Sequence, residues 1–254
     1  MKWFGKTGMT LINQPMERYN RQIILPEIGT DGQQKIGQAS VLVVGVGGLG
    51  NTICTYLVAA GIGKLTMIDA DTVAAHNLQR QVLYRESQIG KSKALEAKKS
   101  LQDLNSHVEI IAYDQYFNEE NAADIVKDAD IVIDATDNYR TRYLINDVCV
   151  KLEKPFIYGA IADYCGQLAL FNYKQGATYR CLYPDEKEMI ASQKKIVGVL
   201  GILPGIIGCM QVNEAFKLIT GYGEPLNSKL FHLDLQTNQT FIIDIPAVAG
   251  NRER

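Results

Sequence analysis

Three glycines and one aspartate have the spacing with the clearest chemical meaning in this sequence. Gly45, Gly47 and Gly50 follow the apolar segment 41–44, which is typical of a buried parallel strand. In such a turn the first glycine permits a tight bend, the second lets the backbone approach a phosphate, and the third lets the next helix pack against the strand. Asp69 ends the following apolar segment, where a carboxylate can accept hydrogen bonds from ribose hydroxyl groups. The spacing therefore predicts a nucleotide-binding turn.

Polar residues after Asp69 favour chemistry at phosphates over hydride transfer. Asn77, Arg80 and Gln81 follow within a short reach of the same strand ends, and so does Lys93. An enzyme that transfers hydride needs an apolar nicotinamide pocket there, whereas two cations suit a phosphoryl group. An NAD-dependent oxidoreductase stays open as an alternative, supported by the glycine turn and Asp69 alone.

A series of motifs, in order along most of the chain, resembles a known family. The motifs are RYNRQIILPEIG at 18–29, GVGGLG at 45–50, DADTV at 69–73, NLQRQ at 77–81, GKSK at 90–93, DATDN at 134–138, YRCLYPD at 179–185 and GVLGILPGIIG at 198–208. On these motifs the chain resembles the MoeB/ThiF/HesA family, adenylyltransferases of ubiquitin-like sulfur carrier proteins that are related to ubiquitin-activating enzymes. The resemblance covers residues 17–245.

The resemblance implies a reaction and a partner. In this family the C-terminal Gly-Gly carboxylate of the carrier attacks the α-phosphate of ATP, which gives an acyl-adenylate and releases pyrophosphate. Negative charge develops on the α-phosphate and on the leaving group, so the protein contributes mainly positioning and cationic stabilisation. The pathway is thiamine or molybdopterin biosynthesis, and the motif YRCLYPD favours the thiamine branch. The family also implies a homodimer.

The resemblance further implies roles for single residues. Arg80 and Lys93 are expected to contact the phosphates. Arg21 is expected to reach the site of the neighbouring subunit, and Asp137 to hold Mg²⁺, which prefers oxygen ligands. The residues implied to bind the nucleotide are Gly45, Gly47, Gly48, Gly50, Asp69, Asn77 and Gln81.

Each of these charged residues also has a simpler interpretation. An isolated Arg or Lys is usually a solvated surface charge, and Arg21 is placed where its stem could lie over the core. Asp137 equally suits the N-cap of a helix that begins near Asn138. A nucleotide-binding docking module of the same fold without catalysis is therefore a second alternative. The residues that favour the enzyme are Arg21, Arg80, Lys93 and Asp137.

Two departures from the family pattern concern cysteine. Many members hold a structural zinc with two C-x-x-C pairs, but here Cys181 alone remains of the first pair, with Thr178 at the earlier position, and the second pair is missing. Tetrahedral zinc needs four ligands, so we predict no structural zinc. Some relatives bind the carrier covalently through a cysteine that would fall at or near Lys194, and residues 184–196 contain no cysteine. An external sulfur donor is therefore expected to receive the acyl-adenylate.

Composition predicts one domain of an ordinary kind. The 254 residues are 46% hydrophobic and 21% charged, and the net charge of −2 gives no electrostatic case for binding nucleic acid. The longest apolar stretch, 197–210, is too short and too interrupted by Pro204 and glycines to span a bilayer. The first ten residues lack the continuous apolar segment of a signal peptide. We expect a cytoplasmic protein that binds no membrane.

The alternation of apolar and amphipathic segments predicts an α/β fold with a doubly wound, mostly parallel sheet of Rossmann type. Strands are expected at 41–44, 65–69, 108–112, 131–135, 155–159 and 166–171, and helices at 48–60, 91–104, 119–127, 139–152 and 205–220 after an amphipathic arm and helix at 17–39. An antiparallel hairpin around Thr237 and Asn238 continues the sheet. Its apolar residues belong to the core or to a surface for the carrier: Leu230, Leu233, Phe241 and Ile243.

These elements predict one adenylyltransferase domain over residues 1–254. Its nucleotide-binding half covers 17–154, and its carrier-binding half covers 155–245. The second half contains a polar crossover loop at 184–196, which we expect to lie over the tail of the carrier or to form an ordinary solvated connection.

Overall fold

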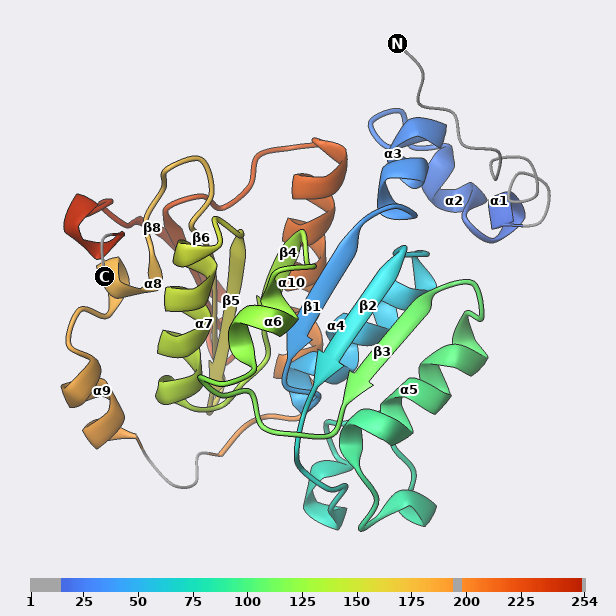
Figure 1. Cartoon of the computed structure of the whole chain (residues 1–254), viewed down its shortest axis with the longest axis horizontal. Coiled ribbons are helices and arrows are strands. Elements are labelled where there is room, and N and C mark those ends of the chain that lie inside the picture. Colours follow the sequence, from blue (N-terminus) through green and yellow to red (C-terminus); the bar gives the residue numbers. More distant parts are fainter. Residues whose placement is uncertain (1–14, 194–197, 253–254) are drawn as a thin grey trace.

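A computed structural model describes residues 15–193 and 198–252, and its centre is an eight-stranded sheet (Figure 1). The strand order is β3-β2-β1-β4-β5-β6-β7-β8. The strands are β1 Ser40–Val44, β2 Lys64–Ile68, β3 Glu109–Tyr113, β4 Ile131–Asp134, β5 Phe156–Ala162, β6 Cys165–Phe171, β7 Lys229–Asp234 and β8 Gln239–Asp244. The first five run parallel, and the last three continue the sheet antiparallel. The predicted fold class is confirmed.

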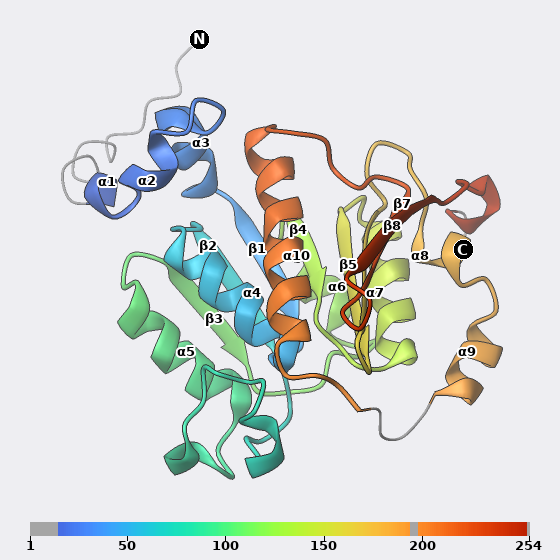
Figure 2. The same ribbon diagram turned by 180° about the vertical axis from the view of Figure 1, so that it is seen from behind.

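Helices cover both faces of this sheet. They are α1 Pro15–Arg18, α2 Asn20–Ile23, α3 Gly29–Ile36, α4 Gly48–Ala59, α5 Lys93–Leu104, α6 Ala122–Val126, α7 Tyr139–Lys151, α8 Tyr179–Leu182, α9 Glu186–Ser192 and α10 Leu203–Thr220, with short 3-10 helices η1 Ala75–Asn77, η2 Glu86–Gln88 and η3 Ala249–Asn251. Helices α6 and α7 pack on one face, and α4, α5 and α10 pack on the other, which faces the viewer in Figure 2. Within the described residues, no helix is both long and apolar enough to cross a lipid bilayer.

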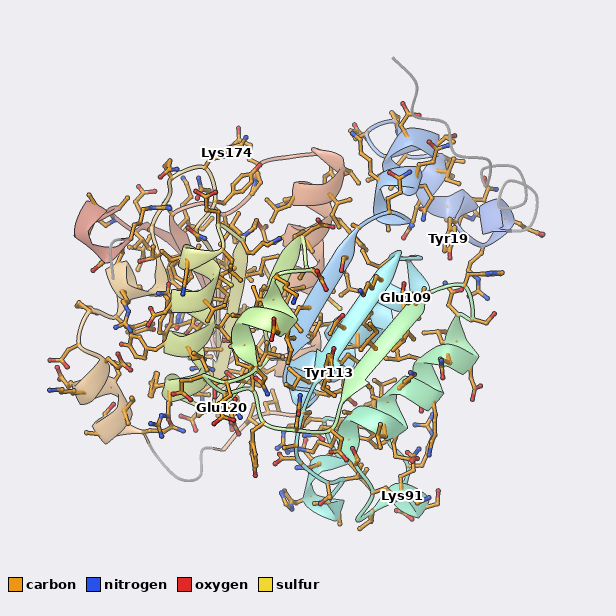
Figure 3. All side chains as sticks on the ribbon, in the orientation of Figure 1. Tyr19, Lys91, Glu109, Tyr113, Glu120 and Lys174 are labelled. Carbon is orange, nitrogen blue, oxygen red and sulfur yellow. The ribbon has the colours of Figure 1, made fainter. Side chains whose placement is uncertain are left out.

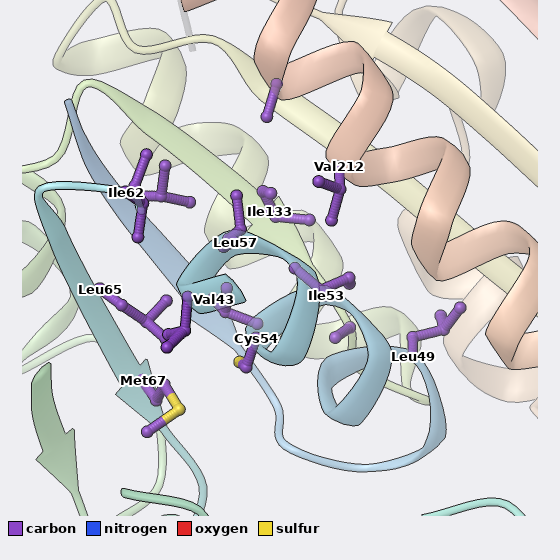
Figure 4. Close-up of a cluster of buried hydrophobic side chains, with 14 of the residues drawn as sticks. Val43, Leu49, Ile53, Cys54, Leu57, Ile62, Leu65, Met67, Ile133 and Val212 are labelled. Carbon is purple, nitrogen blue, oxygen red and sulfur yellow. The ribbon is translucent and has the colours of Figure 1, made fainter. Parts of the chain in front are cut away.

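The central strand β1 is buried on both faces. Val43 faces α4, where it meets Ile53 and Leu57 in the cluster that Figure 4 shows, while Leu42 faces the side of α6 and α7. Successive side chains of a strand point to opposite faces, so a strand covered on both sides needs a continuous apolar run. This requirement explains why the apolar segment 41–44 predicted β1 so closely.

The amphipathic arm and helix expected at 17–39 form three short helices, the first of which begins at Pro15. Helices α2 and α3 are separate because Pro26 disfavours a helical conformation at the residue before it and Gly29 adopts a positive φ of 57°. Asn105 Nδ2 donates a hydrogen bond of 2.8 Å to the hydroxyl of the buried Tyr19. In Figure 3, Tyr19 lies toward Glu109, at the edge where the parallel strands begin. The arm is therefore fixed at the end of the sheet where the parallel strands begin, opposite their carboxyl ends.

The segment expected as a crossover loop contains a helix. Helix α9 occupies Glu186–Ser192, and the Asp185 side chain caps it by accepting a hydrogen bond of 2.9 Å from Glu188 N. Lys194, where relatives carry a cysteine, lies outside the described residues, as do the first ten residues. Helix α10 begins at Leu203, two residues earlier than expected, because Pro204 suits the first helical turn.

Candidate functional site

The glycine turn after β1 packs directly on the loop after β4. Gly45 has a φ of +93°, which favours glycine, and a methyl group on it would lie 2.7 Å from the carbonyl oxygen of Ala135. Gly50 packs so tightly against the Gly45 carbonyl group that no side chain fits between them. Helix α4 begins at Gly48, so its first amide groups have no acceptor within the helix and can bind an anion. The turn thus has the geometry of a phosphate site.

Asp69 joins the end of β2 to this turn. Its Oδ2 accepts a hydrogen bond of 2.6 Å from Val46 N, and its Oδ1 accepts one of 2.8 Å from Asp71 N. Burial raises the pKa of Asp69, and the Val46 hydrogen bond and the charge of Lys93 oppose that rise. Each carboxylate oxygen keeps a lone pair, so both can still accept a ribose hydroxyl.

The loop after β2 brings Arg80 and Gln81 to the glycine turn. A methyl group on Gly48 would lie 3.5 Å from Arg80 Cδ, so the arginine stem crosses the first turn of α4. A methyl group on Gly47 would lie 3.6 Å from Gln81 Nε2. The Gln81 side chain is buried, and its Oε1 has no hydrogen-bond partner among the described residues. Both residues therefore lie where a bound phosphate would be held.

Asn77 shapes the turn that presents these two residues. Its Oδ1 accepts a hydrogen bond of 3.3 Å from Ala74 N, and its carbonyl group accepts from Arg80 N at 3.0 Å and from Gln81 N at 2.9 Å. The buried Tyr84 hydroxyl, which donates to Val46 O at 2.8 Å, ties the loop to the glycine turn. The backbone hydrogen bonds fix the turn that carries Arg80, and Arg80 Nη1 also donates a hydrogen bond of 3.1 Å to His76 O.

Lys93 reaches the same edge from the first turn of α5. Its Nζ lies 2.8 Å from Asp71 Oδ2, and its side chain is 6% exposed while that of Asp71 is 63% exposed. An ammonium group has three donors, so Lys93 can hold Asp71 and still donate to a phosphate. Asp71 is a site residue that the sequence reasoning missed, although it stands in the DADTV motif.

Asp137 lies in the loop after β4, and the helix-cap interpretation of it is wrong. Asn138 is the N-cap of α7, since its Oδ1 accepts a hydrogen bond of 2.9 Å from Thr141 N. The Asp137 side chain is exposed and forms no hydrogen bond with the described residues, so both carboxylate oxygens are free for a cation. Oxygen ligands of this kind fit Mg²⁺.

A buried ion pair beneath Asp137 was also missed. Arg142 Nε donates to Asp134 Oδ2 at 3.1 Å, and Arg142 Nη2 donates to Thr136 O at 2.7 Å. Burial raises the pKa of Asp134, while Arg142 and the Thr136 hydrogen bonds oppose the rise. The two charges lie eight residues apart on a strand and a helix, a spacing that carries no signal in the sequence.

Arg21 alone among the expected charged residues lies away from this site. Gln22, the next residue of α2, donates to Gln33 Oε1 at 2.7 Å, and Gln33 Nε2 donates to Ala60 O at 2.9 Å. Ala60 is the C-cap of α4, so α2 packs at the opposite end of that helix from Gly48 (Figure 1). Twelve helical residues separate the two ends by about 18 Å. The expected residues that lie at the carboxyl ends of the parallel strands within one chain are therefore Asp69, Asn77, Arg80, Gln81, Lys93 and Asp137.

Comparisons with known proteins agree with this arrangement. Residues 19–252 match the ThiF family. The chain belongs to the ThiF family. It is 43% identical over 232 residues to the sulfur carrier protein adenylyltransferase of Thermus thermophilus, and the match covers 89% of this chain and 86% of that protein.

A longer relative in maize shares the same region. The adenylyltransferase and sulfurtransferase MOCS3-1 of Zea mays is 42% identical over 218 residues, which cover 85% of this chain. This chain spans 47% of the length of that maize protein.

Solved structures share the fold of this ThiF-family chain. The crystal structure of PaaA superposes with a TM-score of 0.79 at 25% identity, and the match covers 96% of this chain and 78% of PaaA. The Escherichia coli protein MccB, crystallised with ATP, gives a TM-score of 0.78 at 24% identity over 86% of this chain and 66% of MccB.

Cys181 lies away from the nucleotide site, where α8 meets the C-terminal segment. Its sulfur accepts hydrogen bonds of 3.4 Å from Thr178 N, from Val248 N and from Asn251 Nδ2. Burial raises the pKa of Cys181, but the hydrogen bonds from Asn251, Thr178 and Val248 outweigh it and leave that pKa below its usual value. The thiolate is thus the better acceptor for these donors.

Removal of this thiol is expected to cost more stability in alkaline solution than at neutral pH. The pKa of Cys181 is lower in the folded protein than in the unfolded chain. The contribution of the Cys181 thiolate to the free energy of unfolding is therefore complete above the unfolded pKa and is lost as pH falls through the folded pKa. Cys181→Ala and the unchanged chain are compared by urea unfolding at about pH 9.5 and about pH 7. An equal loss of unfolding free energy at both pH values contradicts the assignment, and Cys165→Ala, which removes a half-buried thiol on β6, is the control.

Proposed function

We propose that this chain is an ATP-dependent adenylyltransferase acting on the C-terminal Gly-Gly carboxylate of a ubiquitin-like sulfur carrier protein. The observation that supports this most strongly is that Arg80 and Lys93, together with the loop that carries the exposed Asp137, lie at the carboxyl ends of neighbouring parallel strands, beside the glycine turn. The names of the Thermus thermophilus and maize relatives support adenylyl transfer. An oxidoreductase needs an apolar pocket for nicotinamide, and charged side chains at this position do not provide one. The charges therefore disfavour an oxidoreductase.

The proposed reaction forms one bond and breaks one bond at the α-phosphate. A carboxylate oxygen of the carrier bonds to the α-phosphorus, and the bond from that phosphorus to the oxygen of the β-phosphate breaks, releasing pyrophosphate. The amide groups at the start of α4 and the side chains of Arg80 and Lys93 stabilise the charge that develops on the phosphates. Asp69 accepts the ribose hydroxyl groups. Mg²⁺, held by Asp137, neutralises further negative charge when bound.

The carrier is proposed to bind the carboxyl-terminal half of the chain. On β8, Phe241 is 48% exposed and Ile243 is 51% exposed, whereas Leu230 and Leu233 of β7 are buried in the core. Exposed apolar side chains on an edge strand suit a protein partner. Residues 184–196 contain no cysteine, so the acyl-adenylate passes to an external sulfur donor in thiamine or molybdopterin biosynthesis.

Exchange of ATP with pyrophosphate tests this function and the role of Arg80. The exchange is expected only when a carrier ending in Gly-Gly is added. Arg80→Ala is expected to lower its rate at least about 100-fold, because one phosphate cation is lost in the transition state. The control is Arg85→Ala, which removes an exposed arginine of the same loop. Carrier binding without exchange in the unchanged chain would favour the docking module.

Arg21 is proposed to act in the site of a second copy of this chain. Helix α2 lies at the far end of α4 from its own glycine turn, so Arg21 has no phosphate to contact within one chain. A mostly apolar groove of about 370 Å³ lies beside it, between α2, α4 and α10. The exposed Tyr56 and the half-buried Phe216 line this groove among other residues, as expected for a surface between two copies.

Mixing two inactive variants tests this dimer. Arg21→Ala and Asp137→Ala are each expected to abolish exchange. Random reassociation of equal amounts, after reversible dissociation, makes half of the dimers mixed, and each mixed dimer has one intact site, so about a quarter of the activity returns. Native mass spectrometry verifies the mixed dimers. No recovery in a mixture that contains them would remove Arg21 from the neighbouring site.

We also propose that this protein holds no structural zinc. Around Cys181, Thr178, Val248 and Asn251 point N–H donors at the sulfur, whereas a zinc site needs lone pairs directed at the metal. The purified protein is expected to hold well below about one equivalent of zinc by plasma mass spectrometry, and chelator treatment is expected to leave its thermal unfolding unchanged. One equivalent that resists dialysis would contradict this.

A further inference from the structure

A buried ion pair lies directly beneath the loop that carries Asp137. Asp134 ends β4 with a fully buried side chain, and the side chain of Arg142, on α7, is 9% exposed. Arg142 Nε donates to Asp134 Oδ2 at 3.1 Å. The pair connects β4 to α7, the helix that follows the Asp137 loop.

The hydrogen bonds of this pair fix the main chain of the loop. Thr136 N donates to Asp134 Oδ1 at 2.8 Å, and Thr136 Oγ1 donates to the same oxygen at 2.6 Å. Arg142 Nη2 donates to Thr136 O at 2.7 Å, and Gln211 Nε2 of α10 donates to Asp134 O at 2.7 Å. The residue before Asp137 is thus held at its amide, its hydroxyl and its carbonyl group.

Net stability is a poor explanation for this pair. Removing two charges from water costs several kcal/mol per ion. Apolar residues of similar volume often give a folded protein equal or greater stability than such a buried pair. The guanidinium group also lies over the rings of Tyr158 and Tyr139, at 5.4 and 5.7 Å from their centroids, which hold its orientation. The observed bonds specify the shape of one loop, and that loop presents the carboxylate proposed to hold Mg²⁺.

We propose that Arg142 is a positioning residue for this carboxylate. Arg142 binds Asp134 and the carbonyl group of Thr136, and these bonds determine the position of the Asp137 carboxylate relative to the metal ion that accompanies ATP. Arg142 is buried behind the loop, so it acts through the main chain and not by contact with the substrate. This role rests on the proposed function of Asp137.

Arg180 provides a matched control. It is also a buried arginine that forms an ion pair with α7, at 2.6 Å from Asp147, and its guanidinium group also lies over a tyrosine ring, that of Tyr143, at 4.7 Å. Its partners, Asp147 and Glu186, lie outside the Asp137 loop. A lysine at this position disturbs a similar buried pair, and that pair has no hydrogen bond to Asp134, Thr136 or Asp137.

The test measures Mn²⁺ binding to the protein with a non-hydrolysable ATP analogue, by electron paramagnetic resonance. Arg142→Lys keeps the charge but has no planar fork to bond Asp134 and Thr136 together. It is expected to weaken Mn²⁺ binding about 10- to 100-fold, as loss of a residue that orients a metal ligand does. Arg180→Lys is expected to leave it unchanged. In exchange assays, Arg142→Lys is expected to need more Mg²⁺ and to recover at high Mg²⁺.

Unchanged Mn²⁺ affinity in folded Arg142→Lys overturns the proposal, and so does an equal loss in Arg180→Lys. Should Arg142→Lys fail to fold by circular dichroism, Thr136→Val decides, with Thr136→Ser, which keeps the hydroxyl, as its control. Weaker Mn²⁺ binding in Thr136→Val alone supports the proposal, and equal binding in both overturns it. Failure of carrier-dependent exchange in the unchanged chain refutes the proposed function instead, whatever the Mn²⁺ affinities.

Discussion

The close contact between Gly45 and the carbonyl group of Ala135 is the constraint on which the site depends. Strands β1 and β4 are parallel neighbours, and Val44 lies opposite Asp134 in their register, although about ninety residues separate them along the chain. Their carboxyl ends therefore meet, and the absence of a side chain at Gly45 lets the two turns touch. An anion-binding turn and a carboxylate loop are brought together in this way, as a metal-bound phosphate requires.

Much of this arrangement could be predicted from sequence, because each predicted part had a local cause. Buried parallel strands need continuous apolar runs, and Gly45 and Gly50 are required by backbone contacts that any side chain would prevent. The N-terminal arm was less predictable, since its apolar pattern suits a helix and Pro26 interrupts it. Asp137 and Asn138 both suit a helix cap by type, and only the observed hydrogen bond from Thr141 identifies Asn138 as the cap.

The residues that sequence reasoning missed act through tertiary contacts. Asp71 pairs with a lysine twenty-two residues later, and Arg142 with an aspartate on another element. Neither contact has a fixed spacing along the chain. Asp71 is an exposed charge beside the buried Lys93, and Arg142 is a buried charge beside Asp134 of the DATDN motif. The motifs therefore locate the site, and the packing determines how its charges are held.

The charges of the site explain why it suits a metal-bound nucleotide. Asp69, Asp71 and Asp137 face the same edge as Arg80 and Lys93, and Lys93 is already paired with Asp71. A triphosphate alone would meet the uncompensated carboxylate of Asp137, which repels it. A divalent cation would reverse that repulsion if Asp137 holds it as proposed, since the phosphates could bind the same ion.

The two ends of α4 have different uses in the proposed dimer. Its first turn offers amide groups to a phosphate, and its last turn holds the arm that carries Arg21. A two-fold axis that crosses α4 near its middle, at right angles to the helix, would set the two copies of α4 in opposite directions, so the arm of each copy would approach the glycine turn of the other. One interface then completes two sites, because a two-fold axis repeats every contact. The separation of about 18 Å between the ends of α4 thus disfavours Arg21 in its own site and is compatible with it in the partner's.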